Sequence, residues 1–109
     1  MATLHPELTR VFAALADPTR LAVIERLAQG PASVSELSQT FAMAGPSFLK
    51  HLRVLETAGL IRTKKRGRVR TASIEAETMR WVEEWVGLHR AEWARHLDDL
   101  DEFLKQGKN

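Results

Sequence analysis

The chain has 109 residues, no cysteine and a formal net charge of +2. This length accommodates one domain with a modest hydrophobic core and is short for two. Because cysteine is absent, disulfides, thiolate metal ligands and cysteine nucleophiles are all excluded. The balance of 44% hydrophobic and 28% charged residues is typical of a folded protein and not of a disordered one. We therefore expect a single domain over residues 1–109.

Neither a membrane span nor an export signal is predicted. The longest unbroken apolar run, residues 11–16, has six residues, whereas a transmembrane helix needs roughly 20. The N-terminal residues lack the basic start and the apolar stretch of a secretory signal. We expect a cytoplasmic protein without a membrane partner.

Charge is distributed unevenly along the chain. Residues 50–73 carry eight basic side chains and one acidic one, whereas residues 74–104 carry three basic and nine acidic ones. A concentrated basic block in a chain of small net charge indicates a surface that faces a polyanion.

Two helices are predicted in the first 30 residues. The first covers residues 6–16 and starts near Pro6, and the second starts at Asp17 and Pro18, which form an N-cap followed by a proline at the first helical position. Gly30 follows the end of the second helix. The expected apolar stripes are Leu8, Val11, Phe12 and Leu15 in the first helix, and Leu21, Ile24, Leu27 and Ala28 in the second.

A pair of short helices separated by a tight turn follows. Ser33 and Glu36 form a capping-box pattern that starts the first of the pair. Gly45 and Pro46 start the second, and Gly59 ends it. The expected buried side chains are Val34, Leu37 and Phe41 in the first helix, and Phe48, Leu49, Leu52 and Leu55 in the second.

The pattern then changes to that of a hairpin and a long helix. Residues 61–66 alternate, Gly67 marks a turn, and residues 68–74 mix β-branched side chains with arginines. Residues 76–104 contain no proline and repeat apolar side chains at spacings of three and four, which predicts one amphipathic helix before a loose tail at 105–109. The predicted fold is mainly α, with five helices and a two-stranded wing, and contains a winged helix-turn-helix over residues 34–73.

The second helix of the pair is the candidate for entry into the major groove. Such a helix buries one side and presents short polar or cationic groups on the other. Lys50 and Arg53 can reach phosphates, whereas Ser47 and His51 can hydrogen-bond to base edges or to the DNA backbone. Val54 can contact a thymine methyl group. By themselves, Lys50 and Arg53 are equally well explained as the solvated side of an ordinary amphipathic helix.

Positive charge is concentrated on the predicted hairpin, which carries Arg62, Lys64, Lys65, Arg66, Arg68 and Arg70. Six cations in so short a segment repel one another unless an anion is close, and a phosphate backbone supplies that anion. The alternative is a charged edge strand that prevents aggregation. The hairpin lacks the apolar face of a membrane anchor, and residues 49–74 contain no aromatic side chain on which single-stranded bases would stack. Double-stranded DNA is therefore the expected partner.

More than one apolar face is predicted for the last helix, which carries all three tryptophans of the chain, Trp81, Trp85 and Trp93. In so small a chain, the second face is most simply covered by another copy. A two-fold dimer would also present two recognition helices to a near-palindromic site. The expected interface lies on the helices at 1–16 and 76–104 and comprises Leu8, Val11, Phe12, Met79, Val82, Trp85, Val86, Trp93 and Leu97.

Three residues of the last helix have a spacing that suits metal ligands. His89, Glu92 and His96 stand at i, i+3 and i+7, although the alternative is ordinary surface residues and an interface histidine. The tryptophans line either a pocket for an unknown small-molecule effector or the dimer contact. The chain has no glycine-rich phosphate loop, no His-Glu-x-x-His pattern and no serine paired with a base. We therefore expect neither an enzyme nor a cofactor.

Two stretches of the sequence resemble those of a known family. Residues 15–21, with the sequence LADPTRL, and residues 50–61, with the sequence KHLRVLETAGLI, are similar to the ArsR/SmtB family of bacterial winged-helix repressors. The resemblance extends over nearly the whole chain. It implies a dimer built from the first and last helices, a recognition helix at residues 46–57 and a wing at residues 61–73.

The sequence departs from this family at its metal ligands and at the start of the recognition helix. Many members sense metals through a cysteine pair, which is absent here, or through Asp, His and Glu on the last helix, whose usual spacing His89, Glu92 and His96 do not match. Ala44 and Gly45 stand where the family tends to have Ser-Gln, and Leu49 replaces a polar residue. The resemblance indicates a branch without the usual metal ligands.

These patterns together predict a transcriptional regulator. We expect a homodimer that binds a near-palindromic operator in double-stranded DNA and represses transcription. Two alternatives remain open. One is a metal-responsive repressor that uses the last helix, and the other is a winged-helix module whose basic wing binds an acidic protein instead of DNA.

Overall fold

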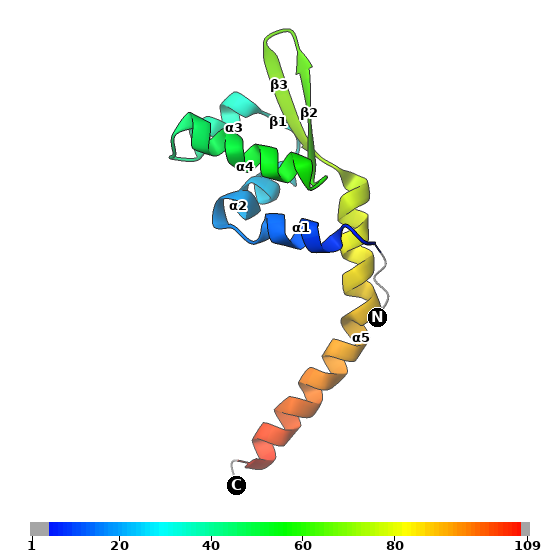
Figure 1. Ribbon diagram of the computed structural model, residues 1–109. Coiled ribbons are helices and arrows are strands. Elements are labelled where there is room, and N and C mark those ends of the chain that lie inside the picture. The colour runs from blue at the N-terminus through cyan, green and yellow to red at the C-terminus, as the bar shows by residue number, and fades with distance from the viewer. Residues whose placement is uncertain (1–4, 108–109) are drawn as a thin grey trace.

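Five helices and three β-strands follow one another in the computed structural model, which describes residues 5–107 (Figure 1). In chain order they are α1 (Leu8–Leu15), α2 (Pro18–Leu27), β1 (Ala32–Ser33), α3 (Val34–Thr40), α4 (Gly45–Thr57), β2 (Ile61–Arg66), β3 (Val69–Ile74) and α5 (Ala76–Gly107). The five predicted helices and the predicted hairpin are therefore confirmed. We call β2, β3 and the turn between them the wing.

The hydrophobic core forms where α1, α2 and α3 pack around α4 and the base of the wing. Phe48 and Leu55 of α4 and Leu60, just before β2, have no exposed surface, and Ile61, the first residue of β2, is 2% exposed. Burial of such large side chains stabilises the fold by roughly 1.5–3 kcal/mol each. Because these residues all come from α4 and the segment after it, the same core orients the helix and the wing.

Side-chain caps define the starts of α2 and α3. The Asp17 carboxylate accepts a hydrogen bond of 3.0 Å from the backbone N–H of Arg20, with Pro18 at the first helical position. At α3, the hydroxyl of Ser33 accepts from the Glu36 N–H at 3.1 Å, while the Glu36 carboxylate accepts from the Ser33 N–H at 3.0 Å. Both predicted caps are confirmed, because each satisfies backbone donors that a helix start leaves unpaired.

Within residues 5–107 the sheet has three antiparallel strands in the order β1-β3-β2, one more than predicted. The extra strand, β1, pairs Ala32 and Ser33 with β3, and two residues are too few to show a period-two pattern. Gly67 in the hairpin turn has a φ of 62°, a left-handed backbone conformation in which a β-branched or bulky residue would be strained. The turn has two residues, Gly67 and Arg68, and only the first of them has a positive φ. This combination matches the type II′ hairpin turn.

Several predicted positions on the helices are corrected by the structure. α1 begins at Leu8 and not near Pro6, and Leu49 is 49% exposed where a buried residue was expected. In α2, Leu21 is 46% exposed and Val23 takes its place in the core. These helices have apolar residues on adjacent stripes, so the packing partners decide which stripe is buried.

Length and exposure distinguish α5 from the other helices. Its first turns pack against the body, where Met79 and Val82 contact the core, while its later residues extend away from the body (Figure 1). The helix continues to Gly107, so residues 105–107 of the predicted tail are helical, and residues 108–109 lie outside the described part of the chain. No helix within residues 5–107 combines the length and apolar character needed to cross a membrane.

The capping box of α3 yields a stability prediction. Ser33→Ala removes the acceptor for the Glu36 N–H and should lower the free energy of unfolding by about 1 kcal/mol. Urea unfolding followed by circular dichroism measures the change. Ser35→Ala, an exposed position in the same helix, serves as the control and should change the midpoint little. Equal effects of the two substitutions would contradict the capping role.

Candidate nucleic-acid interface

The exposed side of α4 is held outward by the core beneath it. Phe48, Leu52 and Leu55 are buried, so the opposite side of the helix faces solvent and carries the exposed side chains of Lys50 and Arg53. Ser47, near the N-terminus of α4, is exposed as well. These three predicted DNA-binding residues therefore lie where a nucleic acid can reach them.

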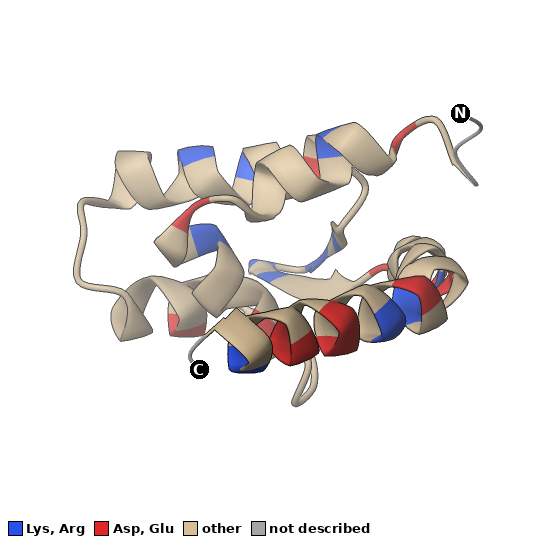
Figure 2. Cartoon of the chain, turned by 90° about the horizontal axis from the view of Figure 1, so that it is seen from below, with Lys and Arg blue, Asp and Glu red and all other residues tan. Residues whose placement is uncertain are grey.

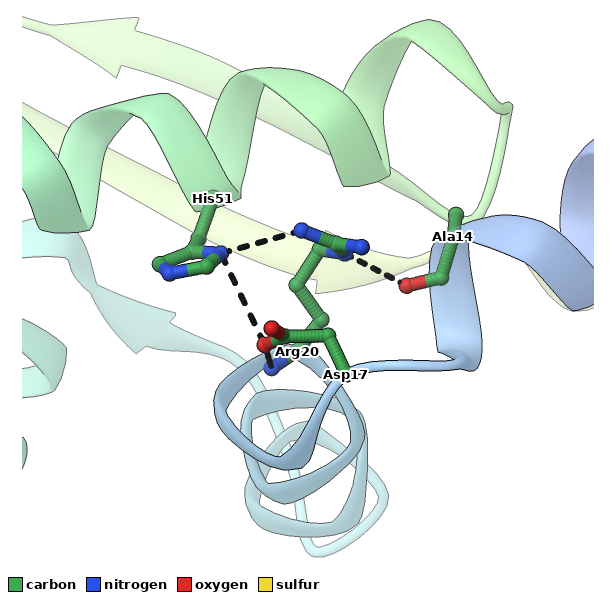
Figure 3. A network of polar contacts seen from close by, with 4 residues as sticks. All are labelled: Ala14, Asp17, Arg20 and His51. Atoms are coloured by element: carbon green, nitrogen blue, oxygen red, sulfur yellow. Dashed lines mark hydrogen bonds and ion pairs between the residues drawn. The ribbon is translucent and has the colours of Figure 1, made fainter.

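His51 is positioned differently from the other predicted residues of α4. It stands three residues after Phe48 and four before Leu55, so helical geometry turns it toward the protein, and its side chain is 22% exposed. Its Nδ1 lies 3.1 Å from Nη1 of Arg20 and 3.6 Å from the Asp17 carboxylate (Figure 3). Because a guanidinium has only donors, the shorter contact requires Nδ1 to accept a hydrogen bond. The structure thus uses His51 to join α4 to α2.

Arg20 completes this network and was not among the predicted site residues. Its Nε donates a hydrogen bond of 2.6 Å to the carbonyl of Ala14, so one guanidinium connects the end of α1 with α4 (Figure 3). The backbone N–H of Arg20 holds the pKa of the Asp17 carboxyl below its usual 3.8, and the Arg20 charge adds to this effect. A signal was present in the sequence, since Asp17, Arg20 and His51 all lie in the two stretches that resemble the ArsR/SmtB family.

The wing presents its cations unevenly. Lys65 and Arg70 are direct cross-strand partners, an arrangement of like charges that is unfavourable without an anion nearby. Arg62 pairs with Glu75 at 3.6 Å at the base of the wing. In the part of the chain that the structure describes, no ion pair engages the remaining wing cations, Lys64, Lys65, Arg66 and Arg68, which are all exposed.

A polar relay connects the wing to α4. Nη1 of Arg70 donates a hydrogen bond of 2.9 Å to the hydroxyl of Thr63, which donates one of 3.0 Å to the Glu56 carboxylate. The relay fixes Arg70 beside the last turns of α4. Glu56 and Thr63 were not predicted, because their role depends on the contact between helix and wing.

An open groove of about 370 Å³ lies between α3, α4 and the wing. Leu49 and Val69 provide apolar surface in it, while Arg68 and Arg70 provide positive charge. Leu49 was expected to be buried, and the structure instead places it on the surface that α4 shares with the wing.

The predicted dimer residues fall into two groups. Leu8 and Val11 are buried within the protomer and leave almost no surface for a partner, and Met79 and Val82 pack on the same core. By contrast, Phe12, Trp85, Val86, Trp93 and Leu97 remain at least partly accessible. The ring of Trp85 contacts those of Phe12 and Trp93, with centroids 5.2 Å and 5.3 Å apart.

Comparison with known proteins identifies the family. Residues 15–64 match the family model described as "Helix-turn-helix domain". Over 66 residues the chain is 41% identical to the HTH-type transcriptional regulator Rv2034 of Mycobacterium tuberculosis, a match that covers 61% of this chain and 62% of that relative. The crystal structure of the ArsR family transcriptional regulator RHA00566 has 51% sequence identity and a TM-score of 0.75, with 85% of this chain and 97% of the other covered. The chain belongs to the ArsR family of transcriptional regulators.

Another ArsR-like structure extends the comparison. The winged helix-turn-helix DNA-binding domain of Mb0332 from Mycobacterium bovis, described as homodimeric, has 26% identity and a TM-score of 0.64, with 83% of each chain covered. The fold is therefore that of a winged helix-turn-helix, and membership of a family of transcriptional regulators places the chain among regulators and not enzymes.

The candidate metal ligands of this ArsR-family chain are not assembled within one protomer. Among residues 5–107, no group of three His, Cys, Asp or Glu side chains is placed to hold a metal ion. The His89 ring instead stacks on Trp93, with centroids 5.6 Å apart and planes inclined by 18°. Glu92 and His96 are exposed.

The environment of Asp17 predicts a pH dependence of stability. Its pKa in the folded protein is below the ordinary 3.8, so its contribution is present above that pH and is lost as the pH falls through the folded value. Asp17→Asn should therefore flatten the decline in melting temperature between about pH 5 and pH 2. Asp99→Asn, at an exposed position on α5, is the control. A decline as steep as that of the unaltered protein would contradict this role.

Proposed function

We propose that this ArsR-family regulator is a homodimer that binds double-stranded DNA sequence-specifically and represses transcription from a near-palindromic operator. The observation that carries the proposal is the juxtaposition of an exposed, cationic α4 with a wing in which Lys64, Lys65, Arg66 and Arg68 have no ion-pair partner among residues 5–107. The curated relative Rv2034 is matched over less than two thirds of its length. Support for DNA binding, assembly and repression therefore comes from the residues of this chain.

Phosphate contacts are assigned to exposed cations that form no ion pair within residues 5–107. Lys50 and Arg53 lie on the solvent-exposed side of α4. The exposed cations of the wing, Lys64, Lys65, Arg66 and Arg68, extend this positive surface beyond the helix. An α-helix fits the major groove, and a flanking basic hairpin reaches the neighbouring backbone. Binding of this kind neutralises phosphates and also relieves repulsion such as that between Lys65 and Arg70.

Base reading is assigned to the exposed short side chains of α4. Ser47 can hydrogen-bond to a base edge, and Leu49 and Val54, which are 49% and 37% exposed, offer apolar contact to a thymine methyl group. His51 supports this surface indirectly, because its contact with Arg20 holds α4 against α2. Base reading is therefore proposed for Ser47, Leu49 and Val54, and not for His51, for which the sequence pattern predicts this role.

The homodimer is assigned to the later part of α5. Trp93, Leu97, Leu100 and Leu104, which we call the α5 seam, recur at spacings of four, three and four and are each at least 42% exposed. A second copy would remove this apolar seam from water and would present two α4 helices to half-sites about 34–36 Å apart. The homodimeric description of the Mycobacterium bovis relative supports this assembly.

Charge on the two ends of the molecule agrees with this arrangement. Figure 2 shows acidic residues gathered toward the C-terminal end of α5, and Figure 1 places that end far from the wing. The acidic end would be repelled by DNA, whereas the basic wing would be attracted to it. DNA binding and dimerisation therefore use separate regions, and a dimer bound across a promoter would block access of the polymerase.

DNA binding is tested by fluorescence anisotropy with a labelled duplex from upstream of the protein's own gene and with a scrambled duplex, each at about 50 mM and about 200 mM salt. Arg66→Ala combined with Arg68→Ala should reduce the slope of log affinity against log salt by about two, since each lost phosphate contact removes about 0.9. Arg95→Ala, on α5, is the matched control and should leave the slope unchanged.

The same titrations distinguish three interpretations of the basic surface: sequence-specific DNA binding, non-specific DNA binding and binding of an acidic protein. Tighter binding to the upstream duplex at the higher salt supports sequence-specific regulation. Equal binding to both duplexes that disappears at the higher salt contradicts specificity for that upstream site, and no binding at low salt favours an acidic protein partner.

The dimer is tested by placing a charge in the α5 seam. Leu97→Glu should shift the sedimentation coefficient toward that of the monomer, because a buried unpaired carboxylate opposes association. Leu88→Glu is the matched control, because this equally exposed leucine lies nine residues earlier and therefore on the opposite side of the helix. A Leu97→Glu protein that sediments as the unaltered protein does would contradict the assigned interface.

A further inference from the structure

A second open cavity, of about 560 Å³, lies between α1, α2 and α4. Its apolar lining comes from Ala13 and Ala14 of α1 and from Val54 and Ala58 at the end of α4. The cavity is within the range of roughly 300–1,000 Å³ found for small-molecule sites. It lies on the flank of α1 that faces α4, whereas Phe12 contacts Trp85 on α5.

Among residues 5–107, four cations and no acidic residue line this cavity. Arg10, Arg20, Lys50 and Arg53 come from three different helices and converge on the apolar lining. Arg10 pairs with Glu7 at 3.4 Å, but that contact is exposed and contributes little. Glu7 beside Arg10 and Asp17 near Arg20 offset part of this charge. Four cations against two nearby carboxylates still leave a net positive charge around the apolar surface, which favours an anionic ligand with an apolar body.

Arg20 is the most strongly positioned of these cations. Its Nε is held by the Ala14 carbonyl and its Nη1 by His51, and its Nη2 makes no hydrogen bond with any residue in 5–107. The guanidinium is therefore fixed before a ligand arrives, and one of its nitrogens is available to donate. A carboxylate is a strong acceptor for such a donor, and little side-chain entropy would be lost on binding.

We propose that the cavity between α1, α2 and α4 is an effector site for an amphiphilic organic carboxylate. The carboxylate is recognised by Arg20 together with Lys50 or Arg53, and the apolar body covers Ala13, Val54 and Ala58. Inorganic phosphate lacks the apolar body, and a neutral alcohol lacks the charge, so neither matches both features of the cavity.

The site has a consequence for regulation that rests on the proposed DNA binding. Lys50 and Arg53 line the cavity and also belong to the surface assigned to phosphates. A bound carboxylate would neutralise cations that DNA needs, so the ligand and the operator would weaken each other's binding reciprocally. Such a ligand would act as an inducer that releases the operator.

Binding itself is tested without DNA. The full chain, labelled with nitrogen-15, is titrated with octanoate and with 1-naphthoate while amide shifts are followed by NMR. We expect saturable shifts at Ala13, Ala14 and Ala58, and an affinity at least about tenfold higher than for 1-octanol or acetate, which each lack one of the two recognised features. The absence of saturable shifts with both carboxylates, or equal binding of 1-octanol, would overturn the proposal.

A cavity-filling variant makes the test specific to this site. Ala13→Phe places a ring in the cavity from an exposed position of α1, and we expect it to weaken octanoate binding by about tenfold or more. Ala28→Phe, at the exposed end of α2 outside the cavity, is the control and should leave binding unchanged. Octanoate binding that survives Ala13→Phe, or shifts confined to the α5 seam, would place the ligand elsewhere and overturn the proposal.

A separate titration tests the link to DNA. Octanoate should weaken binding to the upstream duplex by about tenfold in the unaltered protein and not in the Ala13→Phe variant. Octanoate binding without an effect on a bound duplex would overturn the inducer role. Failure to bind DNA at all would count against the proposed function and would leave the result of the NMR titration intact.

Discussion

The burial of one side of α4 is the constraint on which the rest of the structure depends. Phe48, Leu52 and Leu55 occupy the centre of the core, and a helix that buries three such side chains cannot rotate without exposing them. The other side of α4 is thereby fixed outward with Lys50 and Arg53. The outward orientation of this side of α4 is therefore a direct consequence of core packing.

Polar contacts then connect this helix to its neighbours on both flanks. On one flank, His51 and Arg20 join α4 to α2 and to the end of α1, and on the other, Glu56 and Thr63 join it to the wing. Each contact is modest by itself, since a net hydrogen bond contributes about 0.5–1.5 kcal/mol. Together they hold the helix, the wing and the cavity between α1 and α4 in fixed relation, which is the geometry that coupling between an effector and DNA requires.

α5 differs from the other helices, because only its first turns pack against another element within residues 5–107. Met79 and Val82 contact the core, whereas Trp93 and Leu97 are exposed to solvent. The part of α5 that projects from the body accounts for the longest dimension of the molecule, 65 Å (Figure 1). In the proposed homodimer, a second copy covers this apolar surface and removes it from water. In the proposed function, DNA contacts and assembly lie at opposite ends of the molecule, which agrees with the separation of basic and acidic charge.

Features that depend on neighbours along the chain could be predicted from the order of residues alone. These are the caps at Asp17 and Ser33, the hairpin turn at Gly67, the helical periods and the basic wing, all of which arise from local hydrogen bonding, backbone sterics or charge. The exposure of Leu49, the inward orientation of His51 and the role of Arg20 depend instead on how the helices pack. Adjacent apolar stripes and polar flanks of a helix are equivalent until a packing partner is present. The cavity between α1, α2 and α4 belongs to the second group, since its cations are distant in sequence and converge only when the helices pack.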